Sequence, residues 1–187
     1  PTKDRIQKNE RPQHKVVITK PLLMSATEVT VGQFKKFSAT GYQTEAEKEA
    51  KDAKTGTYLA AASDDLPAAF ITWKDATAYC QWLSTQEKTT YRLPTEAEWE
   101  YVAQFDEGLA SQPHETAIGE SWFESDISRR FRDPVGRGRA NSLGIFDLPG
   151  KQLEWCRDLY RSDYYLNSPQ INPAGSEDGI YPGAHVQ

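Results

Sequence analysis

The sequence predicts a loop-rich α+β domain in which two or three helices pack on small antiparallel sheets. The part of the chain before Phe105 carries three helix-start motifs, each followed by apolar residues at helical spacing. After Phe105, Gly, Pro, Asp and Asn recur so often that only turns and short strands fit between them. The 187 residues suit one domain, and the 37% hydrophobic residues are enough for a core while many loops stay solvated.

The N-terminal segment predicts an arm followed by a strand. Residues 1–12 are polar and end at Pro12, and the strand is expected from His14 to Thr19. Its run Val16-Val17-Ile18 is β-branched and continuous, which is typical of a strand covered on both faces.

The first helix is expected at Thr30, because Thr30 and Gln33 have the Thr-x-x-Gln spacing of a capping box. Phe34 and Phe37 then share one face, and Gly41 ends the helix. Residues 44–65 are mostly small or charged and predict a long surface excursion, with a short helix at Thr44 to Lys51.

Two further helices follow from the same kind of pattern. The segment 72–75 opens one of them, and Ala76, Tyr79, Cys80 and Leu83 lie on its apolar face. The next helix begins at Thr95 after Pro94, with Glu98 completing a capping box. Trp99, Val102 and Ala103 are expected to face inward from that helix.

The charge balance argues against nucleic-acid binding. The net charge is −5, whereas general affinity for nucleic acid needs a basic face. The basic cluster from Arg129 to Arg139 contains Asp133 and follows Glu124 and Asp126, which favours a solvated loop over a site for an acidic ligand. No apolar run reaches 18 residues and no signal-peptide core is present, so we expect a soluble chain of undetermined compartment.

Cys80 and Cys156 are the two cysteines, 76 positions apart. Two buried thiols is the favoured interpretation, with a disulfide and a reactive thiol as alternatives. The chain lacks a Cys-x-x-Cys motif or a Cys/His cluster that would indicate zinc.

The aromatic residues of the turn-rich part are the first candidates for ligand binding. Core filling explains most of them, while Tyr164 and Tyr165 are the best candidates for a peptide or sugar groove, with Trp122 as a further one. Arg92 is expected to pair with Asp147 or Asp158, and substrate binding is its alternative role. The carboxylates of residues 96–100 fit helix capping better than acid–base catalysis.

The segment Tyr91-Arg92-Leu93-Pro94-Thr95-Glu96-Ala97-Glu98-Trp99-Glu100-Tyr101 closely resembles the signature of the formylglycine-generating-enzyme, or sulfatase-modifying-factor, family. The segments 28–34 and 70–76 resemble its E-V-T-x-x-Q-F and V-x-W-x-D-A motifs. Residues 141–150 and 153–158 resemble its N-x-F-G-L-Y-D-M-x-G-N-V-W-E-W-x-x-D stretch. The resemblance spans residues 11–181 and implies a C-type-lectin-like, loop-rich architecture for a single domain at 1–187, lacking the family's C-terminal core segment.

The sequence differs from the family pattern in two ways that affect its chemistry. The family's oxidases hold copper with a cysteine pair beyond an R-G-G-S-W-type segment, and neither Cys80 nor Cys156 occupies those positions. In calcium-binding members an Asn stands where this chain has Lys151. An ammonium cannot coordinate a cation, so Lys151 is expected to pair with Glu154 in place of calcium, which leaves Glu154 a weak calcium candidate.

Two function classes therefore remain open. The favoured one is a non-catalytic domain, without a cofactor of its own, that recognises a protein, peptide or glycan or acts as a scaffold. The alternative is part of an oxidase that converts a sulfatase cysteine to formylglycine, with its catalytic cysteines in a missing C-terminal stretch and copper or calcium bound in the full-length protein. No catalytic residue is assigned in either case.

Overall fold

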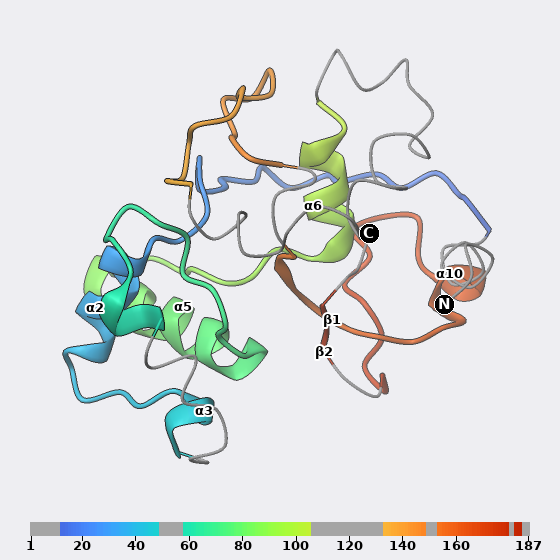
Figure 1. Ribbon diagram of the computed structural model, residues 1–187. Helices are drawn as coiled ribbons and strands as arrows, with labels where there is room; N and C mark the ends of the chain where they lie inside the picture. The colour runs from blue at the N-terminus through green and yellow to red at the C-terminus, as the bar shows by residue number, and fades with distance from the viewer. Residues whose placement is uncertain (1–11, 49–57, 106–132, 149–152, 180–181, 185–187) are drawn as a thin grey trace, which may run out of the picture. The chain divides into compact units, whose positions relative to one another are not determined.

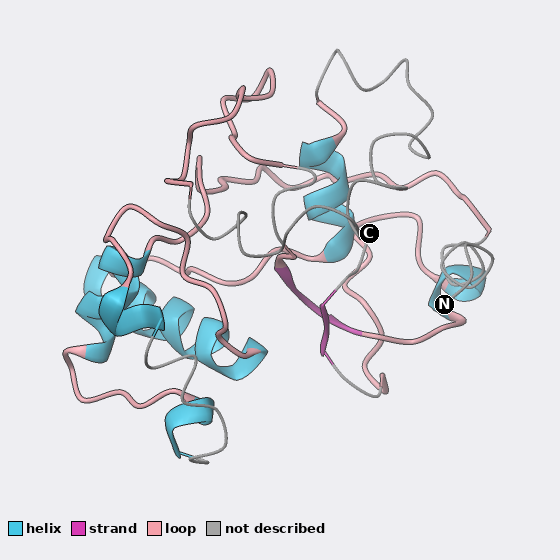
Figure 2. Ribbon diagram, in the orientation of Figure 1, coloured by secondary structure: helices cyan, strands magenta, loops and turns pink. Residues whose placement is uncertain are grey.

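The computed structural model describes residues 12–48, 58–105, 133–148, 153–179 and 182–184. The chain divides into two compact units, which we describe separately (Figure 1). Unit 1 comprises residues 1–23, 93–104 and 153–187, and unit 2 comprises residues 24–92 and 105–152. Helices and long loops predominate over strands among the described residues (Figure 2), as the sequence predicts. The expectation of one domain for 1–187 stays a prediction.

Unit 2 is built on helices α2 (Val31–Ser38) and α5 (Trp73–Glu87), which pack against each other. Both begin where the sequence predicts, because Thr30 and Thr72 each form a complete capping box. Phe34 and Phe37 are 1% and 5% exposed, which confirms the apolar face expected for α2. Tyr79 joins them from α5, with its ring centroid 5.8 Å from that of Phe34.

A buried carboxylate organises the same unit. Asp75 is fully buried and accepts hydrogen bonds from the Tyr42 hydroxyl, the Glu45 amide and both the amide and the hydroxyl of Thr72. Such a group is tolerated in a core only when it is hydrogen-bonded in this way. Asp75 therefore connects the start of α5 to the segment that leads into helix α3 (Glu45–Lys48).

The described residues between 44 and 65 are mostly exposed or half-buried and include the expected short helix, as α3, but two of them are buried. Thr44 and Leu59 are 1% and 7% exposed, and Leu59 belongs to the core cluster of unit 2. Thr44 and Glu47 exchange hydrogen bonds between side chain and backbone, which is a capping box at the start of α3. The tetrapeptide Thr44-Glu45-Ala46-Glu47 repeats the Thr-Glu-Ala-Glu of residues 95–98, so the sequence contained the signal for this helix start.

Unit 1 contains helix α6 (Glu96–Ala103), the short helix α10 (Tyr164–Asn167) and the antiparallel strands β1 (Trp155–Leu159) and β2 (Pro182–Ala184). Helix α6 packs against β1, and Val102 and Ala103 are buried as expected. Along β1 the buried residues alternate, with Cys156 and Asp158 facing inward. In unit 1 a helix thus packs on a small antiparallel sheet, whereas α2 and α5 of unit 2 pack on one another.

The strand expected at His14 to Thr19 does not form. Val17 makes an isolated parallel bridge to Ile171, with hydrogen bonds from Val17 N to Gln170 O and from Asn172 N to Val17 O. Val17 is 38% exposed, while Val16 and Ile18 are half-buried. The segment is extended, but it meets a loop rather than a strand, so one face stays open to solvent.

Candidate binding site

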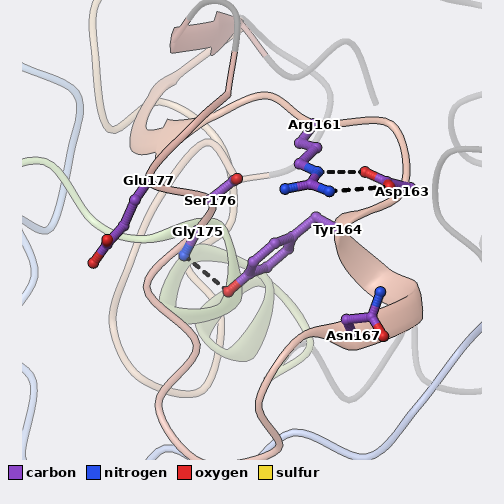
Figure 3. Close-up of a pocket in the computed structure, with 7 residues that line it drawn as sticks. All are labelled: Arg161, Asp163, Tyr164, Asn167, Gly175, Ser176 and Glu177. Carbon is purple, nitrogen blue, oxygen red and sulfur yellow. Dashed lines mark hydrogen bonds and ion pairs between the residues drawn. The ribbon is translucent and has the colours of Figure 1, made fainter.

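A cavity of about 240 Å³ opens in unit 1 beside α10, and Figure 3 labels the seven residues that line it, most of which are polar. They come from the loop after β1, from α10 itself and from the returning segment 175–177. Its volume is below the roughly 300–1,000 Å³ of pockets for drug-sized ligands. The site therefore suits a small ligand or one group of a larger one.

One wall of the cavity is held by Arg161. Its Nε and Nη2 donate to the two carboxylate oxygens of Asp163 at 2.6 and 3.2 Å. Its Nη1 donates to both oxygens of Asp178, at 2.8 and 2.9 Å. These bonds lower the pKa of Asp163, while the pKa of Asp178 is lowered first by the Ser176 hydroxyl and then by Arg161. Arg161 thus joins the two ends of the loop that surrounds the cavity, although exposed ion pairs of this kind add little stability individually.

Tyr164 forms the centre of the site. Its hydroxyl oxygen accepts a hydrogen bond from the Gly175 amide at 3.1 Å, as Figure 3 shows. Burial is the main cause of its raised pKa, so the phenol is protonated at neutral pH and keeps its own proton to donate. Asn167 lies three residues later on the same helical turn, so both side chains share one face of α10.

Two lining side chains retain hydrogen-bonding capacity. Neither the amide of Asn167 nor the carboxylate of Glu177 makes a hydrogen bond or ion pair with the rest of the described chain. Both residues are exposed, so water satisfies them in the absence of a ligand. Amides and carboxylates in such positions can exchange water for the polar groups of a ligand.

Of the binding residues expected from sequence, the structure places Tyr164 at the cavity and others elsewhere. Tyr164 lines the cavity, whereas the adjacent Tyr165 packs edge-on against His14, with ring centroids 5.5 Å apart. Arg92 belongs to unit 2 and is exposed. Trp122 lies outside the described residues, and so does Lys151.

The two acidic partners expected for Arg92 both bind backbone amides. Asp147 accepts from Gly136 and Gly138 at 2.6 and 3.2 Å and orders the loop that contains these glycines. Asp158 is 6% exposed and accepts from the amide of Glu96 at 2.9 Å. There its negative charge also complements the positive end of the α6 dipole. The ion pair of Arg92 with either residue stays a prediction.

Residues 93–101 of the family-like segment 91–101 serve the structure of unit 1. Thr95 and Glu98 form the expected capping box of α6. The indole Nε1 of Trp99 donates to Glu154 Oε2 at 2.9 Å, and the amide of Arg157 donates to the Pro94 carbonyl. These contacts connect the helix to β1 and to the residues before it, which agrees with the interpretation of its carboxylates as structural.

Neither unit by itself contains the pair of cysteines that a two-thiolate copper site needs. Each unit contains one cysteine, Cys80 in unit 2 and Cys156 in unit 1, and both are thiols rather than a disulfide. Burial raises the pKa of Cys80, and burial followed by the charges of Asp158 and neighbouring glutamates raises that of Cys156. Copper(I) favours thiolates, which these environments disfavour. Within the described ranges no three His, Cys, Asp or Glu side chains gather in a metal-binding group.

Sequence reasoning missed Arg161 and Asn167. Asn167 could have been found, because its i, i+3 spacing from Tyr164 puts both on one face of any helix begun there. Arg161 could not, since its partner Asp178 is 17 residues away across a loop.

None of the helices in the described part of the chain is long and apolar enough to cross a membrane.

Residues 2–185 match the family described as the sulfatase-modifying factor enzyme 1-like domain. The chain is 29% identical to a formylglycine-generating enzyme of Streptomyces coelicolor, over 91% of this chain and 68% of that protein. It is 34% identical to the serine/threonine-protein kinase pkn1 of Chlamydia caviae, over 62% of this chain but 18% of that protein. The structure of PvdO from Pseudomonas aeruginosa has a similar fold, with a TM-score of 0.67, 26% identity, and coverage of 92% of this chain and 69% of that one.

Proposed function

Because the chain belongs to the sulfatase-modifying factor enzyme 1-like domain family, we propose that residues 1–187 form a non-catalytic recognition domain of this family. Its ligand is a protein, a peptide or a glycan. The proposal concerns the chemistry of these residues alone.

The observation that carries the proposal is the state of the two thiols. One cysteine per unit cannot supply a thiolate pair within either unit, and the environments of Cys80 and Cys156 both favour the neutral thiol. A family oxidase needs two neighbouring thiolates for its copper, as the resemblance implies. This chain offers no such pair of its own within either unit.

The cavity beside α10 supports recognition as the alternative use of the scaffold. It is small, and two of the side chains that line it, Asn167 and Glu177, have hydrogen-bonding groups that remain available. The similarity to part of a Chlamydia protein kinase also supports this role, because the matching segment makes up 18% of that protein and so forms one part of a larger chain. The proposal includes a C-type-lectin-like arrangement of the loops, which presents variable segments to ligands.

The decisive test is an oxidation assay with the purified chain. A cysteine-containing sulfatase peptide is incubated with the chain, copper, a reductant and oxygen, and its mass is followed with time. We expect no thiol-to-aldehyde conversion, while a formylglycine-generating enzyme in a parallel reaction converts the peptide. Aldehyde formation that requires this chain would disprove the proposal, and loss of that product in Cys80→Ser or Cys156→Ser would identify the thiol responsible.

An oxidase role for a longer protein containing this chain is the second candidate. The similarity to the Streptomyces coelicolor enzyme over 91% of this chain favours it. In that case the copper-binding cysteines come from residues outside 1–187, and the same assay on the full natural protein yields formylglycine. A negative result with that protein under conditions that support the parallel enzyme removes this candidate.

Glu154 and Lys151 provide a separate proposal about calcium. We propose that the ammonium of Lys151 replaces the calcium ion of related domains and pairs with Glu154. The Trp99 indole already donates to one Glu154 oxygen, which supports a structural use of this carboxylate. Calorimetric titration with calcium is expected to show no binding, and tight binding that Glu154→Gln abolishes would contradict the proposal.

A further inference from the structure

We infer that the cavity beside α10 binds a single neutral sugar ring, or a small polyol of the same chemistry. This inference rests on the proposed recognition function and narrows its ligand class. It derives from the size of the cavity, the hydrogen-bonding groups that line it and the charge around it.

The size of the cavity limits the ligand to about one ring. Its volume of about 240 Å³ lies under the usual range for drug-sized molecules. The segments that enclose it are the turn of α10 and the residues from Gly175 to Glu177. A folded peptide or an extended oligosaccharide would have to leave most of its atoms outside this space.

The open groups of the lining match hydroxyl groups. The Asn167 amide offers two donors and one acceptor, the Glu177 carboxylate offers acceptors, and the Tyr164 hydroxyl retains its proton. A hydroxyl both donates and accepts, so a ring carrying several of them can satisfy the Asn167 amide and the Tyr164 hydroxyl, while the Glu177 carboxylate lies on the other side of Tyr164 (Figure 3). The Tyr164 ring adds an apolar surface beside these polar groups, which suits the C–H face of a sugar.

The charge around the cavity disfavours an anion. Arg161 contributes one positive charge, and Asp163, Glu177 and Asp178 contribute three negative charges, so the local balance is −2. The guanidinium is also engaged by Asp163 and Asp178, which leaves it little capacity for a phosphate, sulfate or uronate. A neutral ligand avoids both the repulsion and the cost of desolvating a charge.

The hydrogen bonds of the loop hold the cavity in shape without a ligand. Arg161 joins Asp163 to Asp178, the Ser176 hydroxyl donates to Asp178 at 2.6 Å, and the Gly175 amide donates to Tyr164. A site that is already ordered loses less conformational entropy on binding. Asn167 and Glu177 lie outside this network, so they can be changed without opening the loop.

The test is an NMR titration of the whole chain with D-glucose, D-galactose, D-mannose and N-acetyl-D-glucosamine as probes. At least one of these sugars is expected to shift the amide signals of Asn167, Gly175 and Ser176 in a saturable way. D-glucuronate and D-glucosamine test the charge argument. Glucuronate is expected to bind at least several-fold more weakly than glucose or not at all.

Two variants and one matched control test the site. Asn167→Ala is expected to weaken the binding of a neutral sugar roughly three- to tenfold, which corresponds to one hydrogen bond, whereas Glu177→Gln keeps a hydrogen-bonding group and is expected to weaken it less. Gln170→Ala removes an exposed side-chain amide from the same unit but not from the cavity lining, and it is expected to leave binding unchanged. Amide spectra that keep their dispersion show that each variant is folded.

Several outcomes would overturn the inference: no saturable shift with any neutral sugar, equal binding of glucuronate, binding of glucosamine alone, or equal losses in Gln170→Ala and Asn167→Ala. These outcomes are distinct from failure of the proposed function, which the aldehyde assay detects. A chain without sugar binding and without oxidase activity remains a non-catalytic domain with another ligand.

Discussion

Trp99 Nε1 donates a hydrogen bond to Glu154 Oε2 across 2.9 Å, and this bond joins α6 to the segment that leads into β1. The two residues are 55 positions apart in the sequence. Each belongs to one of the motifs that resemble the family. Their contact shows that these motifs meet in the folded chain and stabilise unit 1.

Replacement of Trp99 by Phe tests that bond. Trp99→Phe keeps an aromatic ring but removes the donor, so we expect it to lower the free energy of unfolding by about 1.5–3 kcal/mol, as for hydrogen bonds to charged groups. Urea denaturation measures the change. In a double-mutant cycle, the effects of Trp99→Phe and Glu154→Gln are expected to be non-additive. Strictly additive effects would show that the two side chains do not interact.

The Tyr42 hydroxyl and the buried Asp75 predict alkaline sensitivity. Burial, and then the hydrogen bond to Asp75, raises the pKa of Tyr42 above its ordinary value of 10.0. The unfolded chain therefore releases this proton at a lower pH than the folded chain. Stability from Tyr42 is complete below about pH 10 and is lost as the pH rises further.

Tyr42→Phe is expected to make the decline of stability above that pH less steep. Near neutral pH the same variant costs about 1.5–3 kcal/mol, because it removes one hydrogen bond to the buried Asp75 carboxylate. Denaturation at a series of pH values measures both effects, and tyrosinate absorbance follows the ionisation. An identical alkaline slope in both proteins would contradict the role of Tyr42.

Gly175 and Gly41 form a matched pair for a test of close packing. Both have positive φ angles, +84° and +93°. A Cβ at Gly175 would lie 2.6 Å from the Cβ of Asp158, whereas one at Gly41 would meet nothing within 4 Å. Gly41→Ala is therefore expected to cost about 1–2 kcal/mol of backbone strain.

Gly175→Ala carries the same strain and adds overpacking of about 1–3 kcal/mol. It is also expected to shift the amide signal of Glu96, which donates to Asp158. Denaturation curves and amide spectra of both variants measure these effects. Equal destabilisation by the two substitutions would show that the loop at Gly175 moves to accommodate the added Cβ without a further loss of stability.

The two thiols are expected to resist alkylation in the folded chain. Cys156 is 3% exposed, and burial raises the pKa of both thiols, so the reactive thiolate is scarce. Iodoacetamide followed by mass spectrometry should label half-buried Cys80 before Cys156, with both labelled rapidly in urea. Rapid labelling of Cys156 without urea would indicate that β1 opens or that its thiol is activated.

The positions where helices begin were the part of the fold that the sequence predicted best. Capping boxes were predicted at Thr30 and Thr95 and a helix start at residues 72–75, and the structure has a capping box at all three places. The fourth box, at Thr44, begins α3 where a short helix was expected from Thr44 to Lys51, but the polar surroundings did not indicate that Thr44 is buried. The β-branched run around Val17 predicted a strand because composition reports a preference for extended backbone, not whether a partner strand is present.

Only part of the candidate site could be predicted from the sequence. Tyr164 was identified as an aromatic residue in a turn-rich region, and the structure assigns Tyr165 a different environment against His14. Adjacent helical residues point about 100° apart, and here Tyr164 lines the cavity while Tyr165 packs against His14. The direction of each side chain depended on where α10 begins.

The amino-acid sequence by itself determined the family resemblance and the positions where α2, α5 and α6 begin, because a capping box is completed by residues three apart in the chain. Only the tertiary structure decided that Asp75 is a fully buried hydrogen-bond acceptor and that Arg161 closes the loop around the cavity through Asp178. Such contacts depend on the path of the chain between distant residues. That path is set by the packing of the whole unit rather than by any local pattern.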